Sequence, residues 1–302
     1  MPSLNSALLF GGLVHSGRVE ALRDEEFRPL VRRALAEDIG SGDVTTLATV
    51  PETATATAVM RAHEPLVVAG LALAEAAFAE VSASVRVRRE LDDGGRAASG
   101  TTLLRVEGPA RALLSAERVA LNFVQKLSGV ATLASRFVEA VKGTPARILD
   151  TRKTTPGWRR LEKYAVACGG ATNHRFGLYD MVLIKDNHLV ALQNEPPNPI
   201  AAAVQRARSR YPDLKIEVEA DTLEQVDQAL AAGAELILLD NMKPEQLRLA
   251  VQKCRGRAGT EASGGVNLET VRAIAETGVD FISVGALTHS ARSADIGLDF
   301  EL

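Results

Sequence analysis

The stretch IEVEADTLEQVDQALAAGAELILLD, residues 216–240, shows how the C-terminal half of the chain is expected to fold. Its first apolar run ends in Glu219 and its second ends in Asp240. Between the two runs, Thr222 and Gln225 form a possible capping box at the start of a helix, and a glycine suits the helix end. A strand, a helix and a second strand in this order predict a parallel βαβ unit.

The same pattern recurs along the chain from about Arg147. The apolar runs that end in a polar residue or a glycine cover residues 148–150, 181–185, 216–219 and 236–240, a stretch ending near Ser263, and 281–285. Helix signals lie between them, such as Pro244 at a first helical position, Gly233 as a stop, and Asn267 with Gly278 at the two ends of another helix. The nearly constant spacing of the last four runs favours a barrel over an open sheet. The segment NEPPNPI, residues 194–200, breaks any helix and is predicted to be a surface loop.

The first part of the chain mixes short strands and helices. A helix is predicted over residues 20–39 with Gly40 as its stop, and a second over residues 71–80. Strands are predicted over residues 54–60, 85–89 and 102–106. This pattern indicates a small α+β domain.

A long helix is expected from about Ala110, with Gly129 as a break. Arg118, Asn122 and Gln125 form a polar stripe along it, which by default is a solvated face. We place the domain boundary at this helix, giving residues 1–127 and residues 128–302. We also expect the last helix to pack back on the N-terminal domain.

Composition and charge exclude several classes of protein. The chain has 302 residues, with 35 Lys and Arg against 38 Asp and Glu, and a net charge of -3 argues against a nucleic acid as its main partner. Its two cysteines, Cys168 and Cys254, lack metal-ligand spacing and favour a reduced, cytoplasmic setting. No apolar run approaches the ~18 residues of a membrane span. Residues 1–17 have no basic start before their apolar stretch, so we expect no signal peptide.

The predicted strand ends carry the residues that could perform chemistry. In a parallel α/β barrel these ends share one mouth, where active sites lie. The residues at these positions are Asp150 with Thr151, Arg152 and Lys153 after it, then Lys185, Glu219, Asp240, Ser263, Gly264, Gly265 and Gly285. So many charged groups in one mouth favour a bound ligand, because clustered ions must be paired or solvated.

The charges sort by sign along the chain. Residues 147–188 hold eight Lys or Arg against four acids. Within this segment the candidate cations are Arg152, Lys153, His174, Arg175 and Lys185, which together suit a small polyanion. Glu219 and Asp240 suit Mg²⁺ or sugar hydroxyls, and the glycine turns suit a phosphate monoester.

Several of these residues also have a plain structural interpretation. His174 could equally be an ordinary loop histidine. Arg159, Arg160 and Lys163 are predicted to be the solvated basic face of a helix and are left out of the site. Cys168 lacks an evident base and is predicted to be a small buried residue.

Seven segments of the chain resemble the quinolinate phosphoribosyltransferase family, also called nicotinate-nucleotide pyrophosphorylase (carboxylating). They are ALAEDIGSGDVTT (34–46), ERVALNFVQKLSGVAT (117–132), ILDTRKTTPGWRRLEKYAVACGGATNHRFGLYDMVLIKDNH (148–188), IEVEAD (216–221), LILLDNM (236–242), EASGGVN (261–267) and DFISVGALTHS (280–290). The resemblance runs from about residue 25 onward. The proline-rich NEPPNP segment departs from it by lengthening a loop.

The resemblance implies an N-terminal sandwich-like α+β domain, a C-terminal α/β barrel with fewer than eight strands, and a homodimer with shared sites. It implies a decarboxylating transfer of phosphoribosyl from 5-phosphoribosyl 1-pyrophosphate to quinolinate in NAD biosynthesis, with Mg²⁺ as cofactor. The implied quinolinate residues are Arg118 from the neighbouring chain, Arg152, Lys153, His174, Arg175 and Lys185. Glu219 and Asp240 would face the ribose and Mg²⁺, and Ser263, Gly264, Gly265 and Gly285 would hold the 5-phosphate. Thr151 and Ser283 complete the implied substrate-binding set, and Lys153, Glu219 and Asp240 are the implied catalytic residues.

Two alternatives stay open on the sequence alone. The chain could be a member of the family that acts on another anionic ring. It could also be a non-catalytic barrel that binds nucleotides without turnover.

Overall fold

The computed structural model describes residues 14, 15 and 18–301, which form two compact units. Unit 1 contains Arg136–Lys153 and Ala171–Ala286. Unit 2 contains the described residues up to Ser135, then Thr154–Gly170 and residues 287–301. The expectation that residues 1–17 are no signal peptide falls outside the described residues, apart from residues 14 and 15.

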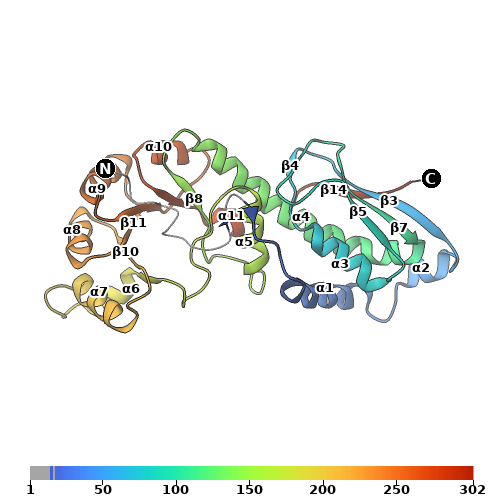
Figure 1. Ribbon diagram of the computed structural model, residues 1–302, viewed down its shortest axis with the longest axis horizontal. Coiled ribbons are helices and arrows are strands. Elements are labelled where there is room, and N and C mark those ends of the chain that lie inside the picture. The colour runs from blue at the N-terminus through green and yellow to red at the C-terminus, as the bar shows by residue number, and fades with distance from the viewer. Residues whose placement is uncertain (1–13, 16–17, 302) are drawn as a thin grey trace. The chain divides into compact units, whose positions relative to one another are not determined.

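Unit 1 is built on a parallel sheet of six strands in the order β8-β13-β12-β11-β10-β9 (Figure 1). The strands are β8 (Arg147–Leu149), β9 (Val182–Ile184), β10 (Ile216–Ala220), β11 (Leu236–Asp240), β12 (Gly259–Ser263) and β13 (Phe281–Ser283). Strand β11, LILLD, is buried on both faces of the sheet, which is why it appeared as an almost continuous apolar run. All six predicted strands are present, and the expectation of fewer than eight is confirmed.

Helices cover the outside of this sheet, with α7, α8 and α9 lying along β10, β11 and β12 (Figure 1). The helices of unit 1 are α6 (Asp186–Val190), α7 (Pro199–Arg210), α8 (Leu223–Ala232), α9 (Pro244–Cys254) and α10 (Val271–Ala275). The capping box of α8 is confirmed, because the Thr222 side chain accepts from the Gln225 N–H and Gly233 ends the helix at φ 81°. The predicted loop 194–200 ends in Asn198, whose side chain caps α7.

The predicted cap at Asn267 is only partly right. Its side chain accepts from the backbone N–H groups of Glu269 and Thr270, at 2.9 and 3.0 Å. These bonds close a turn that precedes α10, and the α-helix itself begins only at Val271. Asn267 therefore starts the turn that leads into the helix.

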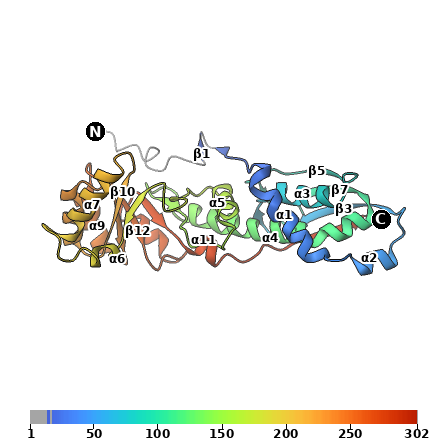
Figure 2. The same cartoon turned by 90° about the horizontal axis from the view of Figure 1, so that it is seen from below.

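Unit 2 contains an antiparallel sheet of four strands in the order β14-β3-β7-β5. The strands of unit 2 are β1 (Val14–His15), β2 (Arg18–Val19), β3 (Thr55–Ala62), β4 (Leu66–Val67), β5 (Arg86–Arg89), β6 (Arg96–Ala97), β7 (Thr102–Pro109) and β14 (Ile296–Glu301). Its helices include α1 (Asp24–Ile39), α2 (Val44–Thr49), α3 (Leu71–Val81) and α5 (Arg159–Cys168). Helix α1 packs on α3, and α3 packs on β5 (Figure 2). The predicted N-terminal α+β architecture is confirmed.

The C-terminal segment returns to the N-terminal sheet as a strand, and the packing of the last helix on the N-terminal domain stays a prediction. Strand β14 pairs with β3 along its whole length, from Ile296 opposite Ala62 to Glu301 opposite Thr57. Ile296, Leu298 and Phe300 alternate with smaller or polar residues, which is the period of a strand. The last helix of the chain, α11 (Ala286–His289), has only four residues.

Helix α4 (Ala110–Ala140) continues through Gly129, so the predicted break there is wrong. A Cβ at position 129 would lie 1.9 Å from the carbonyl oxygen of Arg292. The glycine therefore permits a close backbone approach within a continuous helix. The domain boundary predicted between residues 127 and 128 lies inside α4 and stays a prediction. No helix among the described residues is long and apolar enough to cross a membrane.

The expectation of a solvated basic face on α5 is also wrong. Lys163 is completely buried, and Arg160 forms an ion pair with Glu26 at 2.8 Å. Arg159 donates from Nε to the Thr154 hydroxyl at 3.1 Å. The helix is buried along Leu161–Cys168, and Glu26 lies far away in sequence, so a local pattern could not reveal either fact. The prediction for Cys168 is confirmed, because the thiol is buried and burial raises its pKa.

Candidate active site

One face of the six-stranded sheet carries the charged side chains of the candidate site. Residues two apart on a strand point to the same face, and paired residues of neighbouring parallel strands lie side by side. By this rule the face displays Glu217 and Glu219 of β10, Leu236, Leu238 and Asp240 of β11, Glu261 and Ser263 of β12, and Phe281 and Ser283 of β13. Leu149, Met181, Leu236 and Phe281 form a buried apolar cluster in the same unit. The charged groups thus share this face with an apolar core.

Three charged side chains meet at the carboxyl ends of β9, β10 and β11. Lys185 follows β9, and its Nζ contacts Oε2 of Glu219 on β10. Burial and the negative charges of Glu219 and Asp221 raise the pKa of Asp240, while the charge of Lys185 acts in the opposite direction. The structure therefore brings Lys185, Glu219 and Asp240 within electrostatic reach of one another.

Strand β12 ends in a glycine turn that packs against the end of β11. Gly264 and Gly265 have φ angles of 94° and 60°, in the left-handed region that favours glycine. A Cβ on Gly264 would lie 2.1 Å from Oδ1 of Asn241. The Asn241 N–H donates to the carbonyl oxygen of Ser263 at 2.9 Å. The turn Ser263–Gly265 is therefore held beside the residue that follows Asp240.

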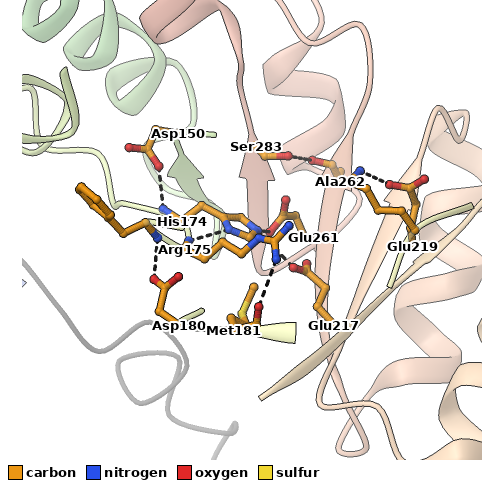
Figure 3. Close-up of polar contacts among 12 residues, drawn as sticks. Asp150, His174, Arg175, Asp180, Met181, Glu217, Glu219, Glu261, Ala262 and Ser283 are labelled. Carbon is orange, nitrogen blue, oxygen red and sulfur yellow. Dashed lines mark hydrogen bonds and ion pairs between the residues drawn. The ribbon is translucent and has the colours of Figure 1, made fainter. Parts of the chain in front are cut away.

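Strand β13 contributes Ser283, which is buried. Its hydroxyl lies 3.5 Å from the carbonyl oxygen of Ala262 on β12 (Figure 3). Gly285 lies two residues after the end of the strand, directly before α11. The Ser283 hydroxyl thus faces the neighbouring strand, and a role for Ser283 and Gly285 in substrate binding stays a prediction.

The loop after β8 is organised by Asp150, which is fully buried. Its Oδ1 accepts from the backbone N–H of His174 at 2.7 Å, and its Oδ2 accepts from Nδ2 of Asn173 at 2.8 Å. The Thr151 hydroxyl accepts from the backbone N–H of Lys153 at 3.1 Å, which shapes the turn around Arg152. The Asp150 carboxylate therefore fixes the position of the segment that carries His174.

His174 is enclosed by two buried carboxylates (Figure 3). Its Nε2 lies 3.2 Å from Oε2 of Glu217 and 3.3 Å from Oε2 of Glu261. Both glutamates are completely buried, and His174 is 8% exposed. We call these three residues the histidine cluster. Because His174 is enclosed in this way, its predicted role as a substrate ligand stays a prediction.

The hydrogen bonds of His174 identify which ring nitrogen carries a proton. The backbone N–H of Arg175 donates to Nδ1 at 2.6 Å, so the Nδ1 lone pair is occupied. Burial and the Glu261 carboxylate raise the pKa of Glu217 to about 7. Because Nδ1 accepts, Nε2 carries the ring proton, and it lies close to both carboxylates.

This proton makes the histidine cluster a poor metal site. The ligand atoms of the three side chains lie within 4.8 Å of one another, as in a metal centre. A metal ion, however, needs a ring nitrogen without a proton. The cluster is therefore a closed group of buried ionisable side chains, and Glu219 and Asp240 are the better candidates to hold a cation.

Arg175 follows the histidine cluster and is 9% exposed. Its Nη1 donates to the carbonyl oxygen of Met181 at 3.1 Å. Burial and the positive charge of Arg152 lower the pKa of Arg175. Because these two guanidinium groups repel each other in a partly buried position, binding of an anion to them is favourable.

Arg118 belongs to the other unit. It lies on α4 with an exposed side chain, next to the exposed Asn122 of the same polar stripe. Gln125, the third residue of the stripe, donates to the carbonyl oxygen of Ile296 at 2.7 Å. The expectation that Arg118 acts in the site of a neighbouring chain stays a prediction.

Sequence reasoning missed four residues that organise the site: Asn173, Glu217, Asn241 and Glu261. The glutamates had a usable signal, since each is a charged residue in the middle of a buried strand. Such a residue requires a partner inside the fold. Asn173 and Asn241 had no comparable signal, because asparagine is common in loops.

Comparison with known proteins gives consistent results over almost the whole chain. Two family models match the chain. The model "Quinolinate phosphoribosyl transferase, N-terminal domain" matches residues 43–128, and the model "Quinolinate phosphoribosyl transferase, C-terminal domain" matches residues 130–299. The chain is 49% identical over 287 residues to a nicotinate-nucleotide pyrophosphorylase (carboxylating) of Mycobacterium leprae, across 92% of this chain and 99% of the relative. It is 41% identical over 278 residues to a probable enzyme of the same name from Bacillus subtilis, across 92% and 94% of the two chains. The solved structure of the nicotinate-nucleotide pyrophosphorylase from Francisella tularensis superposes with a TM-score of 0.88 at 36% identity, across 93% and 98% of the chains.

Proposed function

This chain belongs to the quinolinate phosphoribosyltransferase family, and on that premise we propose that it transfers phosphoribosyl from 5-phosphoribosyl 1-pyrophosphate to quinolinate. The products are nicotinate mononucleotide, CO₂ and pyrophosphate, and the reaction serves NAD biosynthesis. The observation that carries the proposal for the site is the meeting of Lys185, Glu219 and Asp240 at neighbouring strand ends. One mouth thereby offers groups for an anionic ring and for a sugar phosphate.

Quinolinate is a dicarboxylate, and the cations of the loops suit it. The positive charges of Arg152 and Arg175 repel each other, and a bound carboxylate would reduce this repulsion. Thr151, Lys153, His174 and Lys185 complete the proposed quinolinate set. His174 acts in this set through its backbone segment, because both ring nitrogens already face protein groups.

The second substrate is a sugar with a phosphate and a pyrophosphate. Glu219 and Asp240 are proposed to bind the ribose hydroxyls, which carboxylate oxygens accept well. The turn Ser263–Gly265 is proposed to bind the 5-phosphate through backbone N–H groups, with Ser283 and Gly285 beside it. The left-handed glycines support this assignment, because they let the backbone approach an anion closely.

The residues at the strand ends also fit Mg²⁺, which the family typically uses. Glu219 and Asp240 offer the carboxylate oxygens that Mg²⁺ prefers, and burial together with the negative charges of Glu219 and Asp221 raises the pKa of Asp240. A divalent cation held there would neutralise negative charge on the leaving group. We therefore assign Glu219 and Asp240 as the residues that would hold it.

The proposed reaction replaces the C1–O bond of the ribose by a C1–N bond and the C–CO₂ bond of the ring by a C–H bond. The quinolinate ring nitrogen donates its lone pair to C1 of the ribose, and the C1–O bond breaks with its electrons on pyrophosphate. The carboxylates of Glu219 and Asp240 stabilise the positive charge that develops on the ribose. The pyridinium ring then accepts the electrons of the breaking C–CO₂ bond. Lys153 is exposed beside this place and is the proposed donor of the proton that replaces CO₂.

We further propose a homodimer in which Arg118 of one chain completes the site of the other. This proposal is supported by Arg118, which is exposed on α4 and belongs to unit 2, whereas the candidate site belongs to unit 1. Mixing Arg118→Ala and Lys185→Ala dimers after dissociation tests this, because a mixed dimer regains one intact site. Mixed dimers that form without any return of activity would refute the sharing of sites. A cytoplasmic location, which the two free cysteines favour, is part of the proposal.

One assay tests the proposed function. The protein is incubated with quinolinate, phosphoribosyl pyrophosphate and Mg²⁺, and nicotinate mononucleotide and CO₂ are measured. Turnover of nicotinate without turnover of quinolinate would contradict the proposal and favour another anionic ring. Binding of both substrates without any product would favour the non-catalytic alternative.

A second assay tests the role of Arg152. Arg152→Ala is expected to lose roughly 2–4 kcal/mol in kcat/KM, mostly through the KM for quinolinate. Arg210→Ala, which removes an exposed arginine at the end of α7, is the matched control and should behave like the wild type. An unchanged kcat and KM in Arg152→Ala would remove Arg152 from the site.

A further inference from the structure

Asn241, directly after β11, has a backbone conformation that is less favourable for asparagine than for glycine. Its φ is 53°, and it is the single non-glycine residue with positive φ among residues 14, 15 and 18–301. Such a conformation is uncommon for a residue with a Cβ and clusters at functional sites. Glycine would adopt it freely. The presence of asparagine therefore calls for a use of its side chain.

The side chain of Asn241 contacts both neighbouring parts of the candidate site. Its Nδ2 donates to Oδ2 of Asp240 at 2.6 Å. Its Oδ1 lies so close to Gly264 that a Cβ there would be 2.1 Å away. Its backbone N–H also donates to the carbonyl oxygen of Ser263 at 2.9 Å. Asn241 thus contacts both the Asp240 carboxylate and the turn Ser263–Gly265, in addition to the hydrogen bond between the Ser263 side chain and Asp240.

Burial does not account for this arrangement. The Asn241 residue is exposed, so its side chain fills no space in the core. The backbone bond to Ser263 would form equally with glycine at position 241, because it uses no side-chain atom. The contacts that require asparagine are those with Asp240 and Gly264.

We propose that Asn241 is a positioning residue that orients the Asp240 carboxylate and fixes its place relative to the turn Ser263–Gly265. This inference rests on the proposed function, in which Asp240 binds the ribose and the turn binds the 5-phosphate. A carboxylate in an open mouth can rotate, and a hydrogen bond to Oδ2 leaves Oδ1 of Asp240 aimed at the substrate. The same side chain keeps the phosphate turn at a set distance from that carboxylate.

The arrangement predicts an effect confined to one substrate. Asn241 contacts the groups assigned to the sugar phosphate, and the structure gives it no contact with Arg152 or Arg175. Loss of its amide should therefore weaken the use of phosphoribosyl pyrophosphate and leave the KM for quinolinate unchanged. A residue that only maintained the fold would change both substrates together.

Three variants separate the amide from the backbone. Asn241→Gly keeps the left-handed backbone and removes the amide. Asn241→Asp keeps the shape and tolerates positive φ, but it replaces the N–H donor by a second carboxylate beside Asp240. Asn198→Gly is the matched control, since it removes the amide of another asparagine of unit 1, the cap of α7.

The measurements are kcat, the KM of each substrate, and the melting temperature. For Asn241→Gly we expect kcat/KM for phosphoribosyl pyrophosphate to fall about 10- to 100-fold, by analogy with residues that orient a ligand-binding group. The melting temperature should not fall, because glycine relieves the backbone. Asn241→Asp should lose at least as much, and Asn198→Gly should match the wild type. Wild-type kcat/KM in Asn241→Gly, or equal changes for both substrates, would overturn the inference.

A binding experiment separates failure of the inference from failure of the proposed function. Calorimetric titration with phosphoribosyl pyrophosphate and Mg²⁺ needs no turnover. If the wild type makes no product yet binds this compound more tightly than Asn241→Gly does, the proposed function fails and the positioning role stands. If the wild type does not bind it, both are overturned.

Discussion

Removal of the imidazole from the histidine cluster should destabilise the protein strongly. In His174→Ala the carboxylates of Glu217 and Glu261 stay fully buried but lose the Nε2–H that lies 3.2 and 3.3 Å from them. Breaking a buried ion pair in this way costs about 3–5 kcal/mol. Because each 1.4 kcal/mol is about tenfold, the ratio of folded to unfolded protein should fall by about 10²- to 10⁴-fold.

The assay is urea unfolding followed by circular dichroism. Fluorescence is unsuitable, because the single tryptophan, Trp158, belongs to unit 2 and the cluster lies in unit 1. The double variant His174→Ala/Glu261→Gln removes one of the two stranded charges and should be more stable than His174→Ala. His289→Ala, which removes an exposed histidine, should change stability by less than about 0.5 kcal/mol.

Two results would refute this reasoning. A cost of less than about 1 kcal/mol for His174→Ala would mean that the carboxylates need no partner. A double variant less stable than His174→Ala would mean that charge is not the cause of the loss. The first result would also remove the argument that both glutamates act on His174.

Three further predictions concern other parts of the chain. Gly129→Ala should lower the free energy of unfolding measured in urea. Overpacking against the Arg292 carbonyl costs about 1–3 kcal/mol, which exceeds the gain of about 1 kcal/mol in helix propensity. Higher stability of the variant would contradict the close backbone approach. Burial alone would raise the pKa of Glu26, but hydrogen bonds from Arg160 and Arg23 lower it to about 2 from 4.5. Glu26→Gln should therefore lower the free energy of unfolding by about 1 kcal/mol at neutral pH, and this difference should vanish as the pH falls from 4.5 toward 2. A difference that does not change with pH would rule out the ion pair. Removal of divalent cations by a chelator should abolish product formation, and added Mg²⁺ should restore it; undiminished turnover would exclude the cation from the reaction.

Much of the fold was predictable because its signals are local. A strand buried on both faces is a short apolar run, and a polar residue marks its end, as Asp240 does for β11. The start and stop of α8 were likewise visible in Thr222 and Gly233. The failures depend on distant partners. Gly129 looked like a break because the carbonyl of Arg292, which needs the space, lies far along the chain.

The candidate site divides in the same way. Lys185, Glu219 and Asp240 were identified because a strand end is a local feature, and parallel strands bring their ends together. Glu217 and Glu261 were missed because their partner, His174, comes from a loop whose course the sequence does not show. Periodicity can place a charge inside a strand, but it cannot say which loop will neutralise it.

The pairing of β14 with β3 has a consequence for the order of events during synthesis. The sheet of unit 2 acquires its edge strand only when Ile296–Glu301 emerge from the ribosome, long after β3 has left it. Until then β3 exposes a row of unpaired backbone groups, which is a template for pairing with another chain. Since contacts between distant segments form slowly, the nascent protein passes through a period in which this edge is open to aggregation. Strand β14 therefore covers the edge of β3 and becomes the edge strand of the finished sheet.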